Sequence, residues 1–243
     1  LVCEYAAREG GAELVKMTDR GGWTALHRVV YSGDEELAAE VASCCGEEGA
    51  SLLETARRDA AKALEPDGRL RLFRGWPSMV QMDAGHDGAL VSFGGAFCTL
   101  RSRGCIPRGA KAYYELEIVS MVGFSQFGFA RGGFEHVRGG SVEGVGDDSV
   151  SWGVDGERRK KWHGGEEKDY ACTWQQGDVI GLACDLVACK MHVSVNGDFS
   201  APNGAVFDLD IGEEGGGLYA AFSGRSGQVR CNLGEGGAFK HLP

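Results

Sequence analysis

Two patterns of hydrophobic and polar positions divide the chain. Up to about residue 65, Ala, Leu and Glu recur at helical spacing, most clearly at 34–45 (DEELAAEVASCC) and 50–65 (ASLLETARRDAAKALE). From Phe73 onward the pattern changes to short β-branched and aromatic runs that Gly, Asp and Asn separate. The sequence therefore predicts a helical domain at residues 1–68 and an all-β domain at residues 73–243.

The hydrophobic pattern of the second half is typical of antiparallel strands. Residues 189–195 alternate apolar and polar side chains before Asn196-Gly197, a dipeptide that favours a two-residue hairpin. Residues 179–186 (VIGLACDL) hold too few polar positions to face water, so we expect this strand in the middle of a sheet. A second tight turn, of type I′, is predicted at Asp155-Gly156. The fold class is therefore mainly β, a sandwich of antiparallel sheets behind a small helical segment.

Composition narrows the classes of function. The chain has 243 residues, 40 of them glycine, and a formal net charge of −10. A field of this sign repels nucleic acid and anionic lipid, so we expect binding to neither. The run 158–161 (RRKK) beside Trp162 is the basic exception, but acidic residues on both sides leave the local charge near neutral. We therefore expect a protein partner rather than a nucleic acid.

Cysteine usage points to a reducing compartment. The nine cysteines form no Cys-x-x-Cys pair, and several lie inside apolar runs, so we expect reduced, buried thiols rather than disulfides or a zinc site. This predicts an intracellular protein, cytoplasmic or nuclear. The chain begins with Leu1, contains no signal peptide and has no apolar run near the roughly 20 residues that span a bilayer. We expect no membrane insertion and a place within a longer polypeptide or larger complex.

Catalytic motifs are absent from the sequence. There is no Gly-x-Ser-x-Gly, no phosphate-binding Gly-x4-Gly-Lys-Ser/Thr and no His-Glu-x-x-His, and the six histidines are scattered singly. Residues 144–149 (GVGDDS) lack the helix and lysine of a phosphate-binding loop. The sequence predicts a protein that is not an enzyme and uses no cofactor or metal.

The N-terminal part resembles an ankyrin repeat over residues 10–42. Thr24-Ala25-Leu26-His27 stands where that family has Thr-Pro-Leu-His, and 32–34 (SGD) stands at its helix–helix turn. The resemblance implies degenerate ankyrin-like repeats, with a further one at 50–64 and the helix after Leu1 closing a preceding one. We expect His27 to form a hydrogen bond within the repeat rather than to bind a metal or act as a base.

The second half resembles a SPRY domain along nearly its whole length. The matching motifs occur in the family's order: 113–118 (YYELEI), 128–131 (GFAR), 144–156 (GVGDDSVSWGVDG), 174–181 (WQQGDVIG), 194–199 (SVNGDF) and 232–240 (NLGEGGAFK). The resemblance implies a bent, concanavalin-like β-sandwich that serves as a protein-interaction module. It also implies a partner surface made of loops at one end of the sandwich.

The resemblance places candidate partner-binding residues in three segments: 131–134 after the Gly-Phe-Ala motif, the region formed by 147–152 and 158–163, and 222–225, expected as the loop before the final strand. They are Arg131, Phe134, Asp147, Asp148, Trp152, Arg158, Lys160, Trp162, His163, Phe222, Gly224 and Arg225. Their charges suit a partner with acidic and apolar groups.

Three roles remain open for such a module. It is an adaptor that selects a partner, an architectural subunit of a large assembly, or the substrate-recognition part of a ubiquitin ligase whose catalytic region lies outside the chain. The loop that contains the basic run 158–161 and Trp162 has two interpretations as well. It is a solvated hairpin whose Trp162 packs on the sandwich, or it is part of the partner surface.

Overall fold

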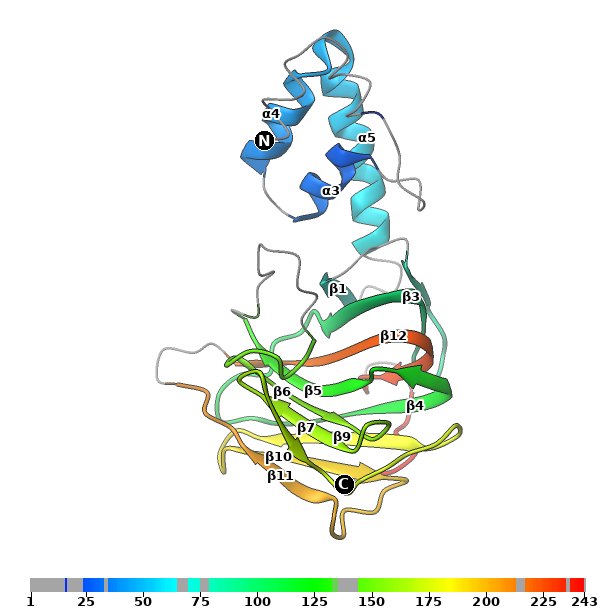
Figure 1. Cartoon of the computed structure of the whole chain (residues 1–243), viewed down its shortest axis with the longest axis vertical. Coiled ribbons are helices and arrows are strands. Elements are labelled where there is room, and N and C mark those ends of the chain that lie inside the picture. The colour runs from blue at the N-terminus through cyan, green and yellow to red at the C-terminus, as the bar shows by residue number, and fades with distance from the viewer. Residues whose placement is uncertain are drawn as a thin grey trace. The chain divides into compact units, whose positions relative to one another are not determined.

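The computed structural model describes residue 16 and residues 24–32, 35–64, 70–74, 79–132, 134, 144–212, 217–234 and 237–242. The chain divides into two compact units, Leu1–Pro66 and Asp67–Pro243. In the described residues the first unit is helical and the second is built of strands (Figure 1). The helix predicted directly after Leu1 lies outside the described residues.

The first unit contains short helices, as the spacing of its apolar residues predicts. They are α3 (Ala25–Ser32), α4 (Glu35–Ser43), the 3-10 turn η1 (Gly46–Glu48) and α5 (Gly49–Leu64). Their apolar faces meet in a small core of Leu26, Ala38, Val41, Ala42, Cys45 and Ala56. Small residues dominate this core, so the helices approach each other closely. A Cβ at Gly49 would lie 2.0 Å from the carbonyl oxygen of Ala42.

His27 forms its hydrogen bonds within the helical unit. Its Nδ1 lies 2.7 Å from the hydroxyl of Thr24, and the backbone N–H of Thr24 also points at this ring nitrogen, at 3.3 Å. The expected local hydrogen bond of His27 is thus confirmed. It fixes the first turn of α3, where the backbone N–H groups have no partner in the helix.

The second unit is a curled antiparallel sheet that has twelve strands in the described part of the chain. The strands are β1 (Leu70–Arg74), β2 (Val80–Asp83), β3 (Ala89–Ser102), β4 (Lys111–Gly123), β5 (Gln126–Arg131), β6 (Ser151–Asp155), β7 (Lys160–His163), β8 (Glu166–Asp169), β9 (Val179–Asp185), β10 (Lys190–Val195), β11 (Gly204–Asp208) and β12 (Leu218–Asn232). The mainly β prediction is confirmed. The strand predicted at 179–186 lies between β4 and β10, in the interior of the sheet.

Strand β12 connects the two halves of the sheet. Along one edge it pairs with β3 over most of its length. Along the other edge its first half pairs with β5, and its second half pairs with β4 (Figure 1). The strands β5, β6, β7 and β8 continue from the first half, and β4, β9, β10 and β11 continue from the second. The single sheet therefore forms two layers that face each other.

Glycines allow β12 to bend where its partner changes. The register with β3 shifts between Gly224 and Ser226, and Gly227 has a φ of 87°. A Cβ at Gly227 would lie 2.0 Å from the carbonyl oxygen of Met121, and one at Gly224 would lie 2.6 Å from Val122. Bulges of this kind let one strand belong to two layers.

A buried tyrosine joins the layers across the core. Tyr114 on β4 is 2% exposed, and its hydroxyl donates to the carbonyl oxygens of Gly128 (2.6 Å) and Ala221 (3.1 Å). Its ring meets Phe129 edge to face, with the centroids 5.4 Å apart. Burial raises the pKa of this hydroxyl well above its ordinary value, so Tyr114 remains a neutral donor.

We expect Tyr114→Phe to lower the free energy of unfolding by about 1–3 kcal/mol, because two buried carbonyl oxygens lose their donor. Chemical denaturation of the full chain measures this. Tyr170→Phe is the matched control: its hydroxyl is also buried, but its neighbour is the weakly polar thiol of Cys172. Equal losses in both variants would contradict the importance of the Tyr114 hydrogen bonds.

Candidate functional site

Several of the predicted partner-binding side chains lie in the core. Phe134 and Phe222 are fully buried, Trp152 is 1% exposed, and Gly224 packs against Phe93 and Val122. Their assignment to a partner surface is corrected on this point, because the described conformation gives a partner no access to these side chains. Phe134 packs with Ala130, Val145 and Ala221 in a small second core.

The two predicted aspartates serve the loop that contains them. Asp147 accepts hydrogen bonds from the side chain of Gln126 (2.8 Å) and from the backbone of Gly144 (2.7 Å). Asp148 accepts from the Ser151 hydroxyl (2.6 Å) and from the backbone of Val150 (3.1 Å). Both carboxylates therefore shape residues 144–151, which gives them a structural role in the described conformation.

The turn before the basic run differs from the predicted one. The loop between β6 and β7 has four residues, 156–159, and its positive φ is at Arg159 (59°) rather than at Gly156. Gly156 is required for another reason: a Cβ there would lie 2.2 Å from the ring of Trp174. Trp174 in turn stacks on Phe127, at 5.3 Å between the centroids. The predicted type I′ turn is wrong because long-range packing, not local conformation, requires this glycine.

The side chain of Asp155 holds the β6–β7 loop in its conformation. Its side chain is fully buried and accepts hydrogen bonds from the backbone of Glu157 and Arg158, both at 2.9 Å, and from the Ser125 hydroxyl at 3.1 Å. Its second oxygen binds Nε of Arg158. This buried ion pair fixes the direction of the Arg158 guanidinium, which is otherwise a long and mobile group.

Arg158 and Arg225 stack with two aromatic rings. The Arg158 guanidinium lies 4.8 Å from the ring centre of Trp162 and 5.1 Å from that of Phe124. The Arg225 guanidinium lies 5.7 Å from the same Phe124 ring. We call these four residues the arginine–aromatic surface. Its spacings are in the range of cation–π interactions.

Phe124 is a member of this surface that the sequence analysis did not identify. It lies in the turn between β4 and β5 with a φ of 57°, and 46% of its side chain is exposed. Its backbone N–H donates to the Glu157 carboxylate at 2.7 Å, which ties this turn to the β6–β7 loop. The available signal was an aromatic residue directly after Gly123, between two strands. Nearby Met121 is also exposed, at 41%.

The remaining predicted residues are separated from this surface. Lys160 forms ion pairs with Asp169 (2.9 Å) and Glu167 (3.3 Å), and these hydrogen bonds raise the pKa of its ammonium group. Arg131 is at the opposite end of β5 from Phe124. His163 stacks on Trp152 on the inner face of its strand. The predicted patch is therefore split, and of the predicted residues Arg158, Trp162 and Arg225 belong to the arginine–aromatic surface.

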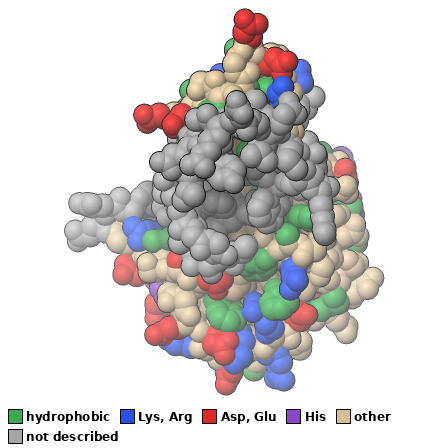
Figure 2. All heavy atoms as spheres, turned by 45° about the horizontal axis from the view of Figure 1, so that its top comes forward, with side chains coloured by type: hydrophobic (Ala, Val, Ile, Leu, Met, Phe, Trp, Pro, Cys, Tyr) green, Lys and Arg blue, Asp and Glu red, His purple; other side chains and the backbone are tan. Residues whose placement is uncertain are grey.

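The β unit carries side chains of both charges. Acidic and basic side chains are intermixed over the visible face of the β unit (Figure 2). Within the described residues no group of three or more His, Cys, Asp or Glu is placed to hold a metal ion. None of the helices in those residues combines the length and apolarity needed to cross a membrane.

We expect Asp155→Asn to lower the free energy of unfolding by about 3 kcal/mol, since it breaks a buried ion pair and leaves Arg158 without its carboxylate. Asp169→Asn is the control, because this 96% exposed carboxylate pairs with Lys160 at the surface and should change stability little. Chemical denaturation of both variants measures the difference. Comparable effects would show that the Asp155 pair does not organise the loop.

Comparison with known proteins identifies the fold family. Residues 111–236 match the SPRY domain, more than half of the chain. The E3 ubiquitin-protein ligase RKP of Arabidopsis thaliana is 34% identical over 142 residues, which cover 58% of this chain and 10% of the ligase. The chain thus corresponds to a small part of that relative.

Solved structures of SPRY domains are also similar. The SPRY domain of human HERC1 has 16% identity and a TM-score of 0.48, covering 66% of this chain and 98% of its own. A second human SPRY domain has 17% identity and a TM-score of 0.48, covering 63% of this chain and 95% of its own. These comparisons give no evidence for ankyrin repeats, which stay a prediction. On the match over residues 111–236, the chain belongs to the SPRY domain family.

Proposed function

We propose that this chain is a non-catalytic adaptor that selects a protein partner through its arginine–aromatic surface. SPRY domains are protein-interaction modules, which supports the general role. The observation that carries the specific proposal is Phe124, a half-exposed ring between the guanidinium groups of Arg158 and Arg225. Arginine and aromatic residues are enriched among the side chains that dominate binding energy at protein interfaces.

The charges of the surface suggest the chemistry of the partner. Arg158 is neutralised by Asp155, whereas no carboxylate of the described residues lies within 4 Å of the exposed Arg225. Met121 and Phe124 supply adjacent apolar area. A partner with an apolar side chain against Phe124 and an acidic group beside Arg225 fits this arrangement. The positive φ of Phe124 adds to the argument, because local strain concentrates at functional sites.

The distribution of exposed apolar side chains favours the adaptor over an architectural subunit. The large exposed hydrophobic residues among the described positions are Met121, Phe124, Val187 and Leu242; Met121 lies near the end of β4, and Phe124 lies in the turn that follows it. A scaffold would need apolar area on more than one face. An architectural role for the helical unit, whether or not its helices are ankyrin-like, is the alternative.

The similarity to RKP supports one form of the adaptor role. We place this SPRY domain at the substrate-recognition step of a ubiquitin ligase whose chemistry would lie outside these residues. The eight described cysteines are free thiols, and five of them are buried, which supports a reducing intracellular compartment.

Affinity purification from the source cells, with the full chain as bait, tests the proposal. We expect Phe124→Ala and Arg225→Glu each to reduce recovery of a defined partner at least ten-fold, since each removes a central contact worth about 1.4 kcal/mol or more. Arg159→Glu is the matched control: it makes the same charge change in the adjacent loop, where the Arg159 side chain is exposed.

Unfolding curves of all three variants verify that they are folded. A partner set that is recovered equally with all variants would contradict the adaptor surface. That result would favour the architectural role.

A further inference from the structure

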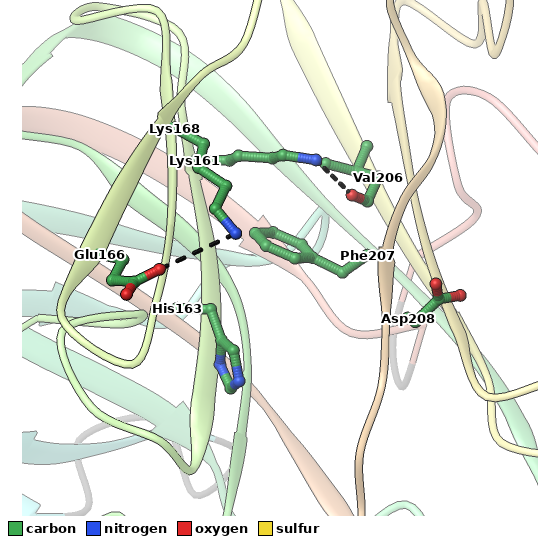
Figure 3. Close-up of a pocket in the computed structure, with 7 residues that line it drawn as sticks. All are labelled: Lys161, His163, Glu166, Lys168, Val206, Phe207 and Asp208. Carbon is green, nitrogen blue, oxygen red and sulfur yellow. Dashed lines mark hydrogen bonds and ion pairs between the residues drawn. The ribbon is translucent and has the colours of Figure 1, made fainter.

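A cavity of about 240 Å³ opens where β7 and β8 approach β11 from the opposite layer (Figure 3). It lies at the free edges of the sandwich, since β8 and β11 are the last strands of their layers. Its lining consists of Lys161, His163, Glu166, Lys168, Val206, Phe207 and Asp208. This volume suits a side chain or a small organic molecule rather than a drug-sized ligand.

The inner face of this layer changes from apolar to charged toward the cavity. The strand register places one row of side chains across β12, β5, β6, β7 and β8: Phe222, Phe127, Val154, Lys161 and Lys168. The first three are fully buried, and the row ends in two lysines. Lys161 is half-buried at this end of the row, whereas Lys168 lies on the exposed edge strand β8 with 68% of its side chain exposed.

Lys161 and Lys168 face each other directly in the antiparallel ladder. Like charges in this position destabilise a sheet unless something compensates them. The Lys161 ammonium donates to the carbonyl oxygen of Val206 at 2.9 Å and lies 5.1 Å from the Phe207 ring centre. No carboxylate in the described parts of the chain lies within 4 Å of it. Among the described residues its positive charge therefore has no ion-pair partner.

The two acidic residues of the lining compensate this charge only in part. Glu166 approaches Lys168 at 3.9 Å, beyond hydrogen-bonding distance. Asp208 binds Lys190 on β10 and points away from the lysines in Figure 3. The cavity thus keeps an excess of positive charge beside an aromatic ring.

His163 completes the wall of the cavity in a fixed orientation. Its Nδ1 lies 2.8 Å from the carbonyl oxygen of Ser151, and because a carbonyl oxygen only accepts, Nδ1 carries the proton. The ring is stacked on Trp152 at 4.9 Å between centroids and meets the edge of Phe207 at 6.5 Å. His163 and Phe207 therefore offer flat apolar area next to the lysines.

We propose that this cavity binds a carboxylate attached to a flat or apolar body, with the carboxylate between Lys161 and Lys168 and the body against Phe207. The carboxylate would supply the missing counter-charge of the facing lysines. Such a group comes either from an acidic side chain of an extended peptide that lies along the free edge of β8 or β11, or from a free small organic acid. The site is independent of the arginine–aromatic surface, because Trp162 projects from the opposite face of β7.

Titration of the ¹⁵N-labelled full chain with benzoate, followed by amide chemical shifts, tests the site. We expect saturable shifts confined to residues 161–168 and 204–208, and no comparable shifts with benzamide, the neutral analogue of benzoate. Binding of benzamide as strong as that of benzoate would overturn the proposal. Equal affinity for inorganic phosphate and benzoate would also overturn the proposal, because the apolar body of the ligand would then contribute nothing to binding.

Three variants make the result specific. Lys161→Gln, which keeps an N–H donor but removes the positive charge, should weaken benzoate binding at least five-fold. Lys160→Gln, the adjacent lysine on the outer face, should leave it unchanged. Glu166→Gln should tighten it, because it removes the carboxylate that competes for Lys168; a misfolded variant does not gain affinity. Unchanged binding in Lys161→Gln or weaker binding in Glu166→Gln would contradict the site.

A capped five-residue peptide with a central Glu, and its Gln counterpart, distinguish the two sources. Tighter binding of the Glu peptide than of benzoate, lost in the Gln peptide, supports the site with a protein segment as the ligand. Tighter binding of benzoate supports the site with a small organic acid as the ligand. Failure of both carboxylate probes to shift these amides rejects the site.

Discussion

The bend of β12 is the constraint on which the β unit depends. One continuous strand pairs with β5 in its first half and with β4 in its second, so both layers are linked to the same backbone. Gly227 makes this possible because its positive φ and its closeness to Met121 exclude a side chain. The layers then close on a core in which Tyr114 supplies hydrogen bonds to carbonyl oxygens of both β5 and β12. The same bend brings Arg225 next to the β4–β5 turn that carries Phe124.

Features that depend on neighbouring residues could be predicted from the sequence. The Asn196-Gly197 turn has positive φ at both residues, 52° and 80°, as a two-residue hairpin requires. The apolar run at 179–186 is an interior strand, as its small number of polar positions predicts. In each case the conformation that the local sequence favours is also the one that the surrounding structure needs.

Features that depend on distant residues could not be predicted. Gly156 resembles a turn glycine, but its requirement comes from Trp174, which is 18 positions later. Ser194 is one of the polar residues that alternate with apolar ones at 189–195, yet it is fully buried. The family resemblance located the partner loops by position, yet it carried no information on exposure; Trp152 and Phe222 therefore seemed available although they are core residues. Phe124 was missed because its significance arises only when Arg158 and Arg225 meet around it.

The basic run that interrupts an acidic chain is explained by the two faces of one short strand. Lys160 and Trp162 project outward, where Lys160 is neutralised by Asp169 and Glu167, and Trp162 is covered by Arg158. Lys161 and His163 project inward, where the opposite layer ends and the core gives way to a cavity. Because side chains alternate in a strand, four consecutive residues serve two separate environments. A run of charges that looks like one patch in the sequence is thus two half-patches of different chemistry.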